Sequence, residues 1–260
     1  MGTASQLSPA ALLVPMLDFA AEFEDETNLW FDYDHVPERV SCAGILGCQR
    51  FQLTPVEPIG WSPDQRWTKY LHVYSLESIA VLTSAGYQRQ RDMNGGRGSG
   101  WRQLREGRQA AAGRRSPVRS LRTSWVRRPA SWTARHPVDV PEPRAILVTL
   151  RHDPGPMDAA VNEFLDECMM PELLMLPGFL GCERYEASEP ADGFGRASRG
   201  FRHPRYLDIY DVTTPEVLTS GTYRRLVMSL DLDADLRAAL RPCGMGVYVQ
   251  RPSAWRMTVR

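Results

Sequence analysis

The chain contains the same pattern twice, and this internal repeat limits its fold more than any other feature. Residues 30–52 align without a gap with residues 164–186, and residues 69–89 align with residues 205–225. Of these 44 aligned positions, 17 are identical. Chance would give only a few identities, so we infer two copies of one structural unit.

Each copy has the pattern of a strand, a helix, two strands, a helix and a strand, which is the order of a ferredoxin-like βαββαβ unit. In the first copy we expect these elements at 12–17, 24–40, 46–52, 69–75, from near Ser78, and at 124–132. In the second copy we expect them at 146–150, 157–175, 180–186, 205–211, from near Thr214, and at 246–250. Gly44 and Gly178 should end the first helices, because glycine tolerates the left-handed conformation. Thr214 and Pro215 should cap and begin the last long helix.

We therefore predict an α+β fold made of two tandem ferredoxin-like units. The expected division is a tail at 1–10, a first repeat at 11–132, a linker at 133–144 and a second repeat at 145–260. An Arg- and Gly-rich insert at about 93–120 lengthens the first repeat.

Alternation with period two gives each third strand an aliphatic face and a polar, aromatic face. The second face carries Tyr70, His72 and Tyr74 in the first copy and Tyr206, Asp208 and Tyr210 in the second. Since both helices of a ferredoxin-like unit lie on one side of its sheet, we expect the aliphatic face to meet them. The two tyrosine rows would then face each other across a semi-polar cavity, which is where a ligand is expected.

Several stretches resemble the EthD-like group of the dimeric α+β barrel superfamily. They are DYDHVPERV from Asp32, GCQRF from Gly47, YLHVYSLES from Tyr70 and VLTS from Val81. The resemblance covers 31–89 and 164–225, and the first and last strands loosely, but not the insert. It implies two units packed sheet to sheet as a pseudo-symmetric dimeric α+β barrel, here a pseudo-dimer within one chain, with a further homodimer left open. Such proteins include cofactor-independent monooxygenases, muconolactone isomerase-like enzymes, polyketide cyclases or dehydratases, and haem-using members, so the fold alone does not choose the reaction.

His35 is the first catalytic candidate, because it matches the histidine of the family's His-x-Pro motif. An imidazole titrates near pH ~6.5, which suits general acid–base chemistry. Asp32 lies three residues earlier, within helical reach, and is expected to orient the ring. The structural alternative is a histidine favoured only by the helix dipole. Met169 stands at the matching position, so the fold does not require histidine there.

His72 is the rival candidate, since it lies on the predicted cavity face. Asp208 matches it in the second copy, and pseudo-twofold packing would bring the two together as an acid–base pair. The alternative is a partly solvated polar row near a barrel mouth. Arg50 and Arg184 recur on the second strands and suit an anionic or enolate substrate, although such an arginine more often pairs with a neighbouring carboxylate. The tyrosines predicted to line the substrate pocket are Tyr70, Tyr74, Tyr206 and Tyr210.

These residues favour a cofactor-independent small-molecule enzyme of the cyclase, isomerase, dehydratase or monooxygenase type. Its substrate would be a hydrophobic or aromatic small molecule in the barrel cavity. The alternative is a non-catalytic small-molecule-binding or structural barrel, so whether the chain is an enzyme stays open. We expect no metal, because the five cysteines form no CxxC pair and show no metal-type spacing with histidine, and no cofactor, with haem as a lesser alternative. An enclosed cavity reached by either histidine would favour the enzyme, and a cavity filled by side chains would argue against it.

Charge and composition weigh against other classes of partner. The 31 basic and 31 acidic residues give a formal net charge of zero, so the whole protein does not attract nucleic acid or anionic membranes. Residues 88–135 contain 13 arginines and three tryptophans, but a solvated insertion explains them better than a nucleic-acid site, and a frame-disrupted stretch of the gene would look the same. Few cysteines, a poor signal-peptide pattern and no long apolar run predict a cytoplasmic protein.

Overall fold

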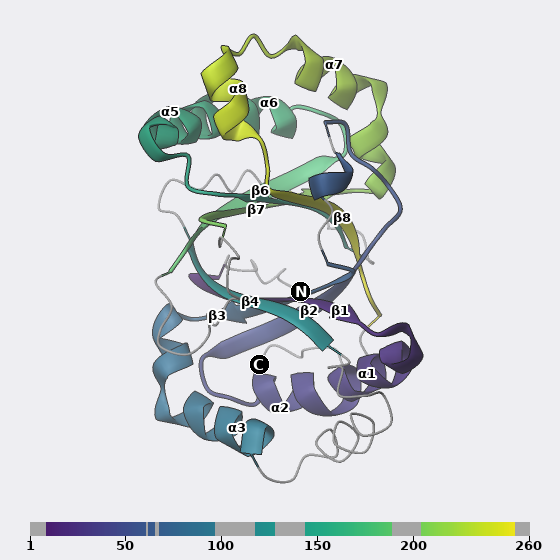
Figure 1. Ribbon diagram of the computed structural model, residues 1–260, viewed down its shortest axis with the longest axis vertical. Coiled ribbons are helices and arrows are strands. Elements are labelled where there is room, and N and C mark those ends of the chain that lie inside the picture. The colour runs from purple at the N-terminus through teal and green to yellow at the C-terminus, as the bar shows by residue number, and fades with distance from the viewer. Residues whose placement is uncertain are drawn as a thin grey trace, which may run out of the picture.

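In the part of the chain that the structure describes, eight antiparallel strands pair edge to edge until the sheet closes on itself as a barrel (Figure 1). The computed structural model describes residues 9–60, 62–65, 68–96, 118–127, 144–188 and 204–252. The strands are β1 (Ala11–Phe19), β2 (Ile45–Leu53), β3 (Tyr70–Leu76), β4 (Val118–Arg127), β5 (Ala145–Arg151), β6 (Phe179–Ala187), β7 (Tyr206–Val212) and β8 (Gly244–Gln250). Their order around the barrel is β1-β3-β2-β8-β5-β7-β6-β4.

The two halves of the barrel have the same strand order. The first half runs β4-β1-β3-β2 and the second runs β8-β5-β7-β6, which in both cases is the order fourth, first, third, second. The register also matches, because Arg50 pairs with His72 between β2 and β3, and Arg184 pairs with Asp208 between β6 and β7. Two seams, β2 with β8 and β4 with β6, join the halves. The predicted α+β architecture is therefore confirmed.

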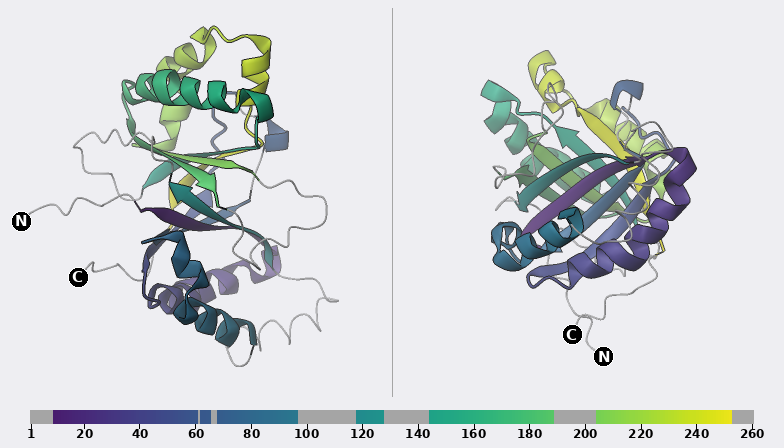
Figure 2. Two further views of the ribbon diagram at one scale, coloured as in Figure 1. Left: turned by 90° about the vertical axis from the view of Figure 1, so that its left-hand side faces the viewer. Right: turned by 60° about the horizontal axis from the view of Figure 1, so that its bottom comes forward.

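Helices cover the barrel on two opposite sides (Figures 1 and 2). The first half carries α1 (Glu24–Trp30), a π-helical segment (Phe31–His35), α2 (Val36–Val40) and α3 (Ala85–Gly96). The second half carries α5 (Asp158–Glu163), a π-helical segment (Phe164–Met169), α6 (Met170–Leu174), α7 (Gly221–Ser229) and α8 (Ala234–Leu240). Short 3₁₀ turns occupy Ala21–Phe23, Pro63–Gln65, Ile79–Thr83, Gly155–Met157 and Pro215–Thr219. Among the described residues, no helix has the length and apolar character needed to cross a membrane.

Two glycines make the turns between the first helix of each half and the next strand. Gly44 has a φ of 87° and Gly178 a φ of 97°, which other residues rarely adopt. A Cβ atom on either would also lie 2.5 Å from a methyl carbon, of Val81 or of Val217 respectively. The predicted left-handed conformation of both glycines is thus confirmed, but their predicted role as helix stops is wrong. The helices end earlier, at Val40 and Leu174, and the glycines stand directly before the next strands.

The predicted cap of the last long helix is wrong. Thr214 begins a 3₁₀ turn and makes no side-chain cap hydrogen bond. The helix α7 starts later, and the hydroxyl of Ser220 accepts a hydrogen bond from the backbone N–H of Tyr223. In the first half, Ser84 accepts from Tyr87 in the same way.

The predicted directions of the strand faces are also wrong. The aliphatic face of each third strand points into the barrel, where Leu71, Val73, Leu207 and Ile209 share one apolar cluster. The tyrosine rows point outward under the helices of their own halves. The physical reason is that a closed barrel interior offers few polar partners, whereas a covering helix can present side chains that satisfy tyrosine hydroxyls and arginines.

The expected substrate cavity inside the barrel is correspondingly filled. The space among Met16, Leu71, Val148, Leu150 and Tyr248 does not admit a water molecule. The expected approach of His72 to Asp208 across that cavity does not occur, since each contacts the arginines of its own half. The fourth strand expected at 124–132 instead begins at Val118 and ends at Arg127. Most of the predicted insert (residues 97–117) and linker (133–143) and the first eight residues of the tail lie outside the described part of the chain.

Candidate functional site

A buried polar cluster centred on Arg50 lies between the first-half helices and the sheet. Its Nε donates to Nε2 of His72 at 3.1 Å, and its Nη2 donates to Oδ1 of Asn28 at 2.6 Å. Nη1 forms an ion pair with Asp32. Because Nε2 of His72 accepts a hydrogen bond, this imidazole is neutral and carries its proton on Nδ1. The expectation that Asp32 orients His35 is corrected, since the carboxylate binds Arg50.

The same network satisfies Tyr70, which was expected to line a substrate pocket. Asn28 donates to the Tyr70 hydroxyl at 3.1 Å, and that hydroxyl donates to Glu24 at 2.5 Å. Lys69 reaches the same carboxylate at 2.7 Å. The tyrosine therefore fastens α1 to β3.

The second half builds the same frame around Arg184. Its Nη1 binds Asp166, its Nη2 donates to Asn162 at 2.8 Å, and its Nε donates to Asp208 at 3.1 Å. The hydroxyl of Tyr206 donates at 2.5 Å to Asp158, the counterpart of Glu24. The alternative that both recurring arginines pair with neighbouring carboxylates is thus the arrangement found.

Asp208 draws two further residues into the second cluster. Arg151 forms an ion pair with it, and the hydroxyl of Thr149 donates to it at 3.0 Å. The matching first-half positions hold Leu17 and Pro15. An arginine has thus been added where an aspartate replaces histidine.

The electrostatics of the two clusters differ as a result. Burial raises the pKa of Asp208, but Arg151 and Arg184 outweigh it and hold that pKa below its usual range. Burial likewise lowers the pKa of Arg184, but Asp208 and Asp166 raise it overall. For Arg50, burial lowers the pKa and the single carboxylate of Asp32 does not restore it. The first cluster therefore holds one arginine and one carboxylate, whereas the second holds two of each.

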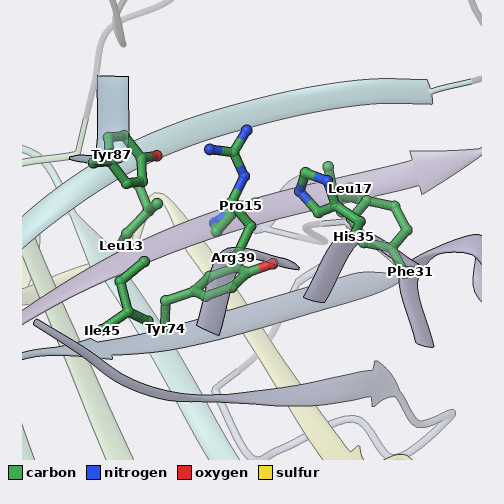
Figure 3. A pocket seen from close by; sticks show the side chains of 9 residues that line it. All are labelled: Leu13, Pro15, Leu17, Phe31, His35, Arg39, Ile45, Tyr74 and Tyr87. Carbon is green, nitrogen blue, oxygen red and sulfur yellow. The ribbon is translucent and has the colours of Figure 1, made fainter. Parts of the chain in front are cut away.

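A small cavity of about 30 Å³ lies under the helices of the first half only a few residues from this cluster. Its lining residues are Leu13, Pro15, Leu17, Phe31, His35, Arg39, Ile45, Tyr74 and Tyr87. In the view of Figure 3, the guanidinium of Arg39 lies between Tyr87 and His35. The ring of His35 also contacts Trp30, with the centroids 4.5 Å apart. Of the predicted site residues, His35 and Tyr74 thus reach a cavity, whereas His72 lies in the Arg50 cluster.

The matching place in the second half is lined by apolar side chains. Met169 stands for His35, Leu173 for Arg39 and Phe179 for Ile45. All three belong to or pack against the apolar cluster that also contains Tyr210 and Tyr223. The polar cavity lining is therefore a property of the first half's sequence.

Sequence reasoning missed Arg39 and the helix residues that bind the central arginines. Extending the repeat upstream at the same offset aligns Asn28 with Asn162, an identity that would have pointed to them. For Arg39 the available signal was an arginine at a helix position where the second copy has Leu173.

Comparisons with solved structures place the fold. An anthrone oxidase-like protein is similar over 99% of this chain and 99% of its own, with 10% identity and a TM-score of 0.50. A variant of chlorite dismutase from Candidatus Nitrospira defluvii is similar over 94% and 92%, with 11% identity and a TM-score of 0.51. A variant of DypB from Rhodococcus jostii in complex with heme is similar over 95% of each chain, with 11% identity and a TM-score of 0.54. No protein-family model and no curated protein matches the sequence. The structural neighbours are dimeric α+β barrel proteins, and at these identities they establish the fold alone.

Because one neighbour binds heme, the described residues were tested for such a fit. The cavity of about 30 Å³ is far below the roughly 300–1,000 Å³ of ordinary ligand sites, and a porphyrin is at the larger end of ligands. His35 is packed against Trp30 and Phe31, which occupy the space a macrocycle would need. The arrangement found does not fit a haem.

Proposed function

We propose that the protein is a small-molecule enzyme whose site is the first-half cavity between the helices and the sheet, with His35 as the acid–base group. The observation that carries this proposal is the cavity itself, because it brings an imidazole, a guanidinium and two phenols together. Such a pocket, apolar with a few convergent polar groups, is the usual form of a ligand site. The proposal moves the site from the barrel interior, which side chains fill, to the helix layer.

The proposed chemistry is proton transfer to or from a hydrophobic or aromatic substrate. Five apolar or aliphatic side chains of the lining, Leu13, Pro15, Leu17, Phe31 and Ile45, would hold its hydrocarbon part. In isomerase, cyclase and dehydratase reactions an acid–base group can assist the bond changes within the substrate, including the loss of water, without an oxidant, which is why we keep the proposal cofactor-independent. A substrate larger than the present cavity requires side chains at its rim to move on binding.

A second candidate is a non-catalytic binding protein. The observation that favours it is the size of the cavity, about 30 Å³, which holds little more than a small polar group. In this case His35 would act as a hydrogen-bonding residue and not as a proton carrier.

Hydrogen–deuterium exchange of enolisable aromatic ketones, followed by NMR, separates the two candidates. The enzyme should accelerate exchange next to the carbonyl, and the His35→Met variant should fall to the uncatalysed rate. This substitution has a matched control in the molecule, because Met169 occupies the same position in the second half. His72→Asn should keep the activity, since His72 lies outside the cavity lining. Equal exchange with His35→Met and the unmodified protein would refute the proposal.

We also propose that the chain arose by tandem duplication of one EthD-like unit. The 17 identities in 44 positions, the matching strand orders and the matching arginine clusters support it. The predicted boundaries of the two repeats, 11–132 and 145–260, follow from the same proposal. Each half expressed alone should assemble, if at all, as a dimer that pairs the two open edges; a stable monomeric half would count against the proposed units.

A further inference from the structure

Arg39 is a buried cation that no described carboxylate neutralises. Its residue surface is 6% exposed, and its Nη1 atom is buried without a hydrogen-bond partner among the described residues. The guanidinium carbon lies 5.3 Å from the centre of the Tyr87 ring. This cation–π contact is favourable, but an aromatic face does not satisfy the five N–H donors of a guanidinium. Buried charges are normally paired, so the guanidinium of Arg39 is suited to bind an anion from outside the chain.

The charge balance around Arg39 points the same way. Among the described residues of the first half, Arg39 and Arg50 face one ion-pair partner, the partly buried Asp32, and His72 is neutral. In the second half, two arginines face two aspartates, and Leu173 replaces Arg39. The first helix–sheet interface therefore carries one positive charge more than the second.

The cavity beside Arg39 has the size of a small polar group. A volume of about 30 Å³ is roughly twice what one water molecule needs. Tyr74 lines the same cavity, and its hydroxyl, which is buried without a hydrogen-bond partner among the described residues, is a second potential donor. Planar, two-oxygen anions match a guanidinium especially well, because two N–H groups can point at two oxygens.

We propose that this cavity binds the carboxylate, or an equally small oxyanion, of the protein's ligand, with Arg39 as its counter-charge. The inference rests on the proposed function, since it names the chemical class of molecule that the same pocket takes. The apolar lining holds the rest of the ligand, and Arg39 is a binding residue that fixes the anionic end near His35. The second half has lost, or never had, this capacity because Leu173 removes the charge.

Formate is the smallest probe of the site. Thermal unfolding of the full chain is measured with increasing formate at constant ionic strength, with a bulky sulfonate as the balancing and control anion. We expect formate to raise the midpoint in a saturable way, because a ligand that binds only the folded state stabilises it. Arg39→Leu should abolish this shift. Arg241→Leu should keep it, since Arg241 is an exposed arginine paired with Asp64 and offers a matched loss of charge.

The possible results distinguish the anion site from the proposed enzyme activity. An equal formate shift in Arg39→Leu and the unmodified protein, or equal shifts with formate and the sulfonate, would overturn the inference. If Arg39→Leu does not fold, Arg39→Gln, which keeps hydrogen-bond donors but no charge, must lose the shift instead. The variant His35→Met should retain the shift while losing proton exchange. A formate shift without exchange would therefore defeat the proposed enzyme alone, and exchange without a formate shift would defeat the anion site alone.

Discussion

The two helix–sheet interfaces share one frame but hold different charges. In each, an arginine on the second strand binds an asparagine and an aspartate from the first helix, and a tyrosine on the third strand binds an acidic residue one turn earlier. The first interface then adds a histidine and an extra arginine beside a cavity. The second adds an aspartate, an arginine and apolar filling. The shared frame is what the fold needs, and the differences are where function is to be sought.

Among the substitutions that test the charge difference between the two interfaces, we expect the largest loss of stability at Asp208. Asp208→Asn leaves the buried guanidinium groups of Arg151 and Arg184 facing a neutral group, and we expect it to lower the free energy of unfolding by about 3–5 kcal/mol. His72→Asn, the matched change in the first half, replaces the imidazole acceptor of the Arg50 hydrogen bond by an amide oxygen without changing any charge, and should cost about 1–2 kcal/mol. Urea unfolding at pH 7 measures both, and equal losses would contradict the assigned charge states.

The pH dependence of stability tests whether Asp208 acts through its charge. The pKa of Asp208 is lowered in the folded protein, so its stabilising contribution is complete above its unfolded pKa, about 3.9, and is lost as the pH falls through the folded value. The gap in unfolding free energy between Asp208→Asn and the unmodified protein should therefore be constant from about pH 5 to 8 and shrink below about pH 4. A gap that is the same at pH 3.5 and pH 7 would show that Asp208 does not act through its charge.

The glycine turns should respond alike in both halves. Gly44→Ala and Gly178→Ala each force a side chain into the left-handed region and place its Cβ against a valine methyl group. We expect each to lower the free energy of unfolding by about 2–4 kcal/mol, from backbone strain and overpacking together. Urea midpoints provide the measurement. A large difference between the two variants would mean that the halves do not share their turn geometry.

The hydroxyl groups of Tyr70 and Tyr206 should contribute equally to stability. Tyr70→Phe and Tyr206→Phe each remove a 2.5 Å hydrogen bond to a carboxylate, and each should cost about 1.5–2 kcal/mol. Burial is the largest cause of the raised pKa of both hydroxyls, so neither ionises near neutral pH. If one substitution were silent, its helix would have to be held by other contacts.

The smallest effect is expected at the helix caps. Ser84→Ala and Ser220→Ala each remove the hydroxyl that accepts from the backbone N–H three residues on, and should cost about 1 kcal/mol. Thr214→Ala serves as the control, because its side chain makes no cap hydrogen bond. A loss at Thr214 as large as that at Ser220 would reverse the assignment of the cap.

The repeat made the architecture predictable, because Gly44 and Gly178 and the paired strand motifs mark the same positions twice. The direction of the strand faces was not predictable from alternation. Period two separates Leu71 from His72, but both faces are buried here, and the sequence of one strand does not tell which layer covers which face. That choice depends on whether a distant helix supplies a partner, as Asn28 does for Tyr70.

The candidate site was predictable only in part. His35 stood out through its motif, and Tyr74 through its strand, although the cavity they share lies under the helices and not in the barrel. Arg39 could not be chosen from the sequence, because most arginines are exposed and paired, and its burial follows only from the packing of α2 against β2 and α3.

The two seams, β2 with β8 and β4 with β6, make this barrel independent of protein concentration and let its halves differ in sequence, unlike a barrel of two identical subunits. Both seams join strands of one polypeptide, so closure of the barrel does not depend on protein concentration. In a barrel made of two identical subunits, every substitution appears twice, so a change that is favourable in one interface is also present in the other, where it can be unfavourable. Here each half mutates separately. Leu173 can therefore fill one interface with an apolar side chain while Arg39 places a buried cation in the other.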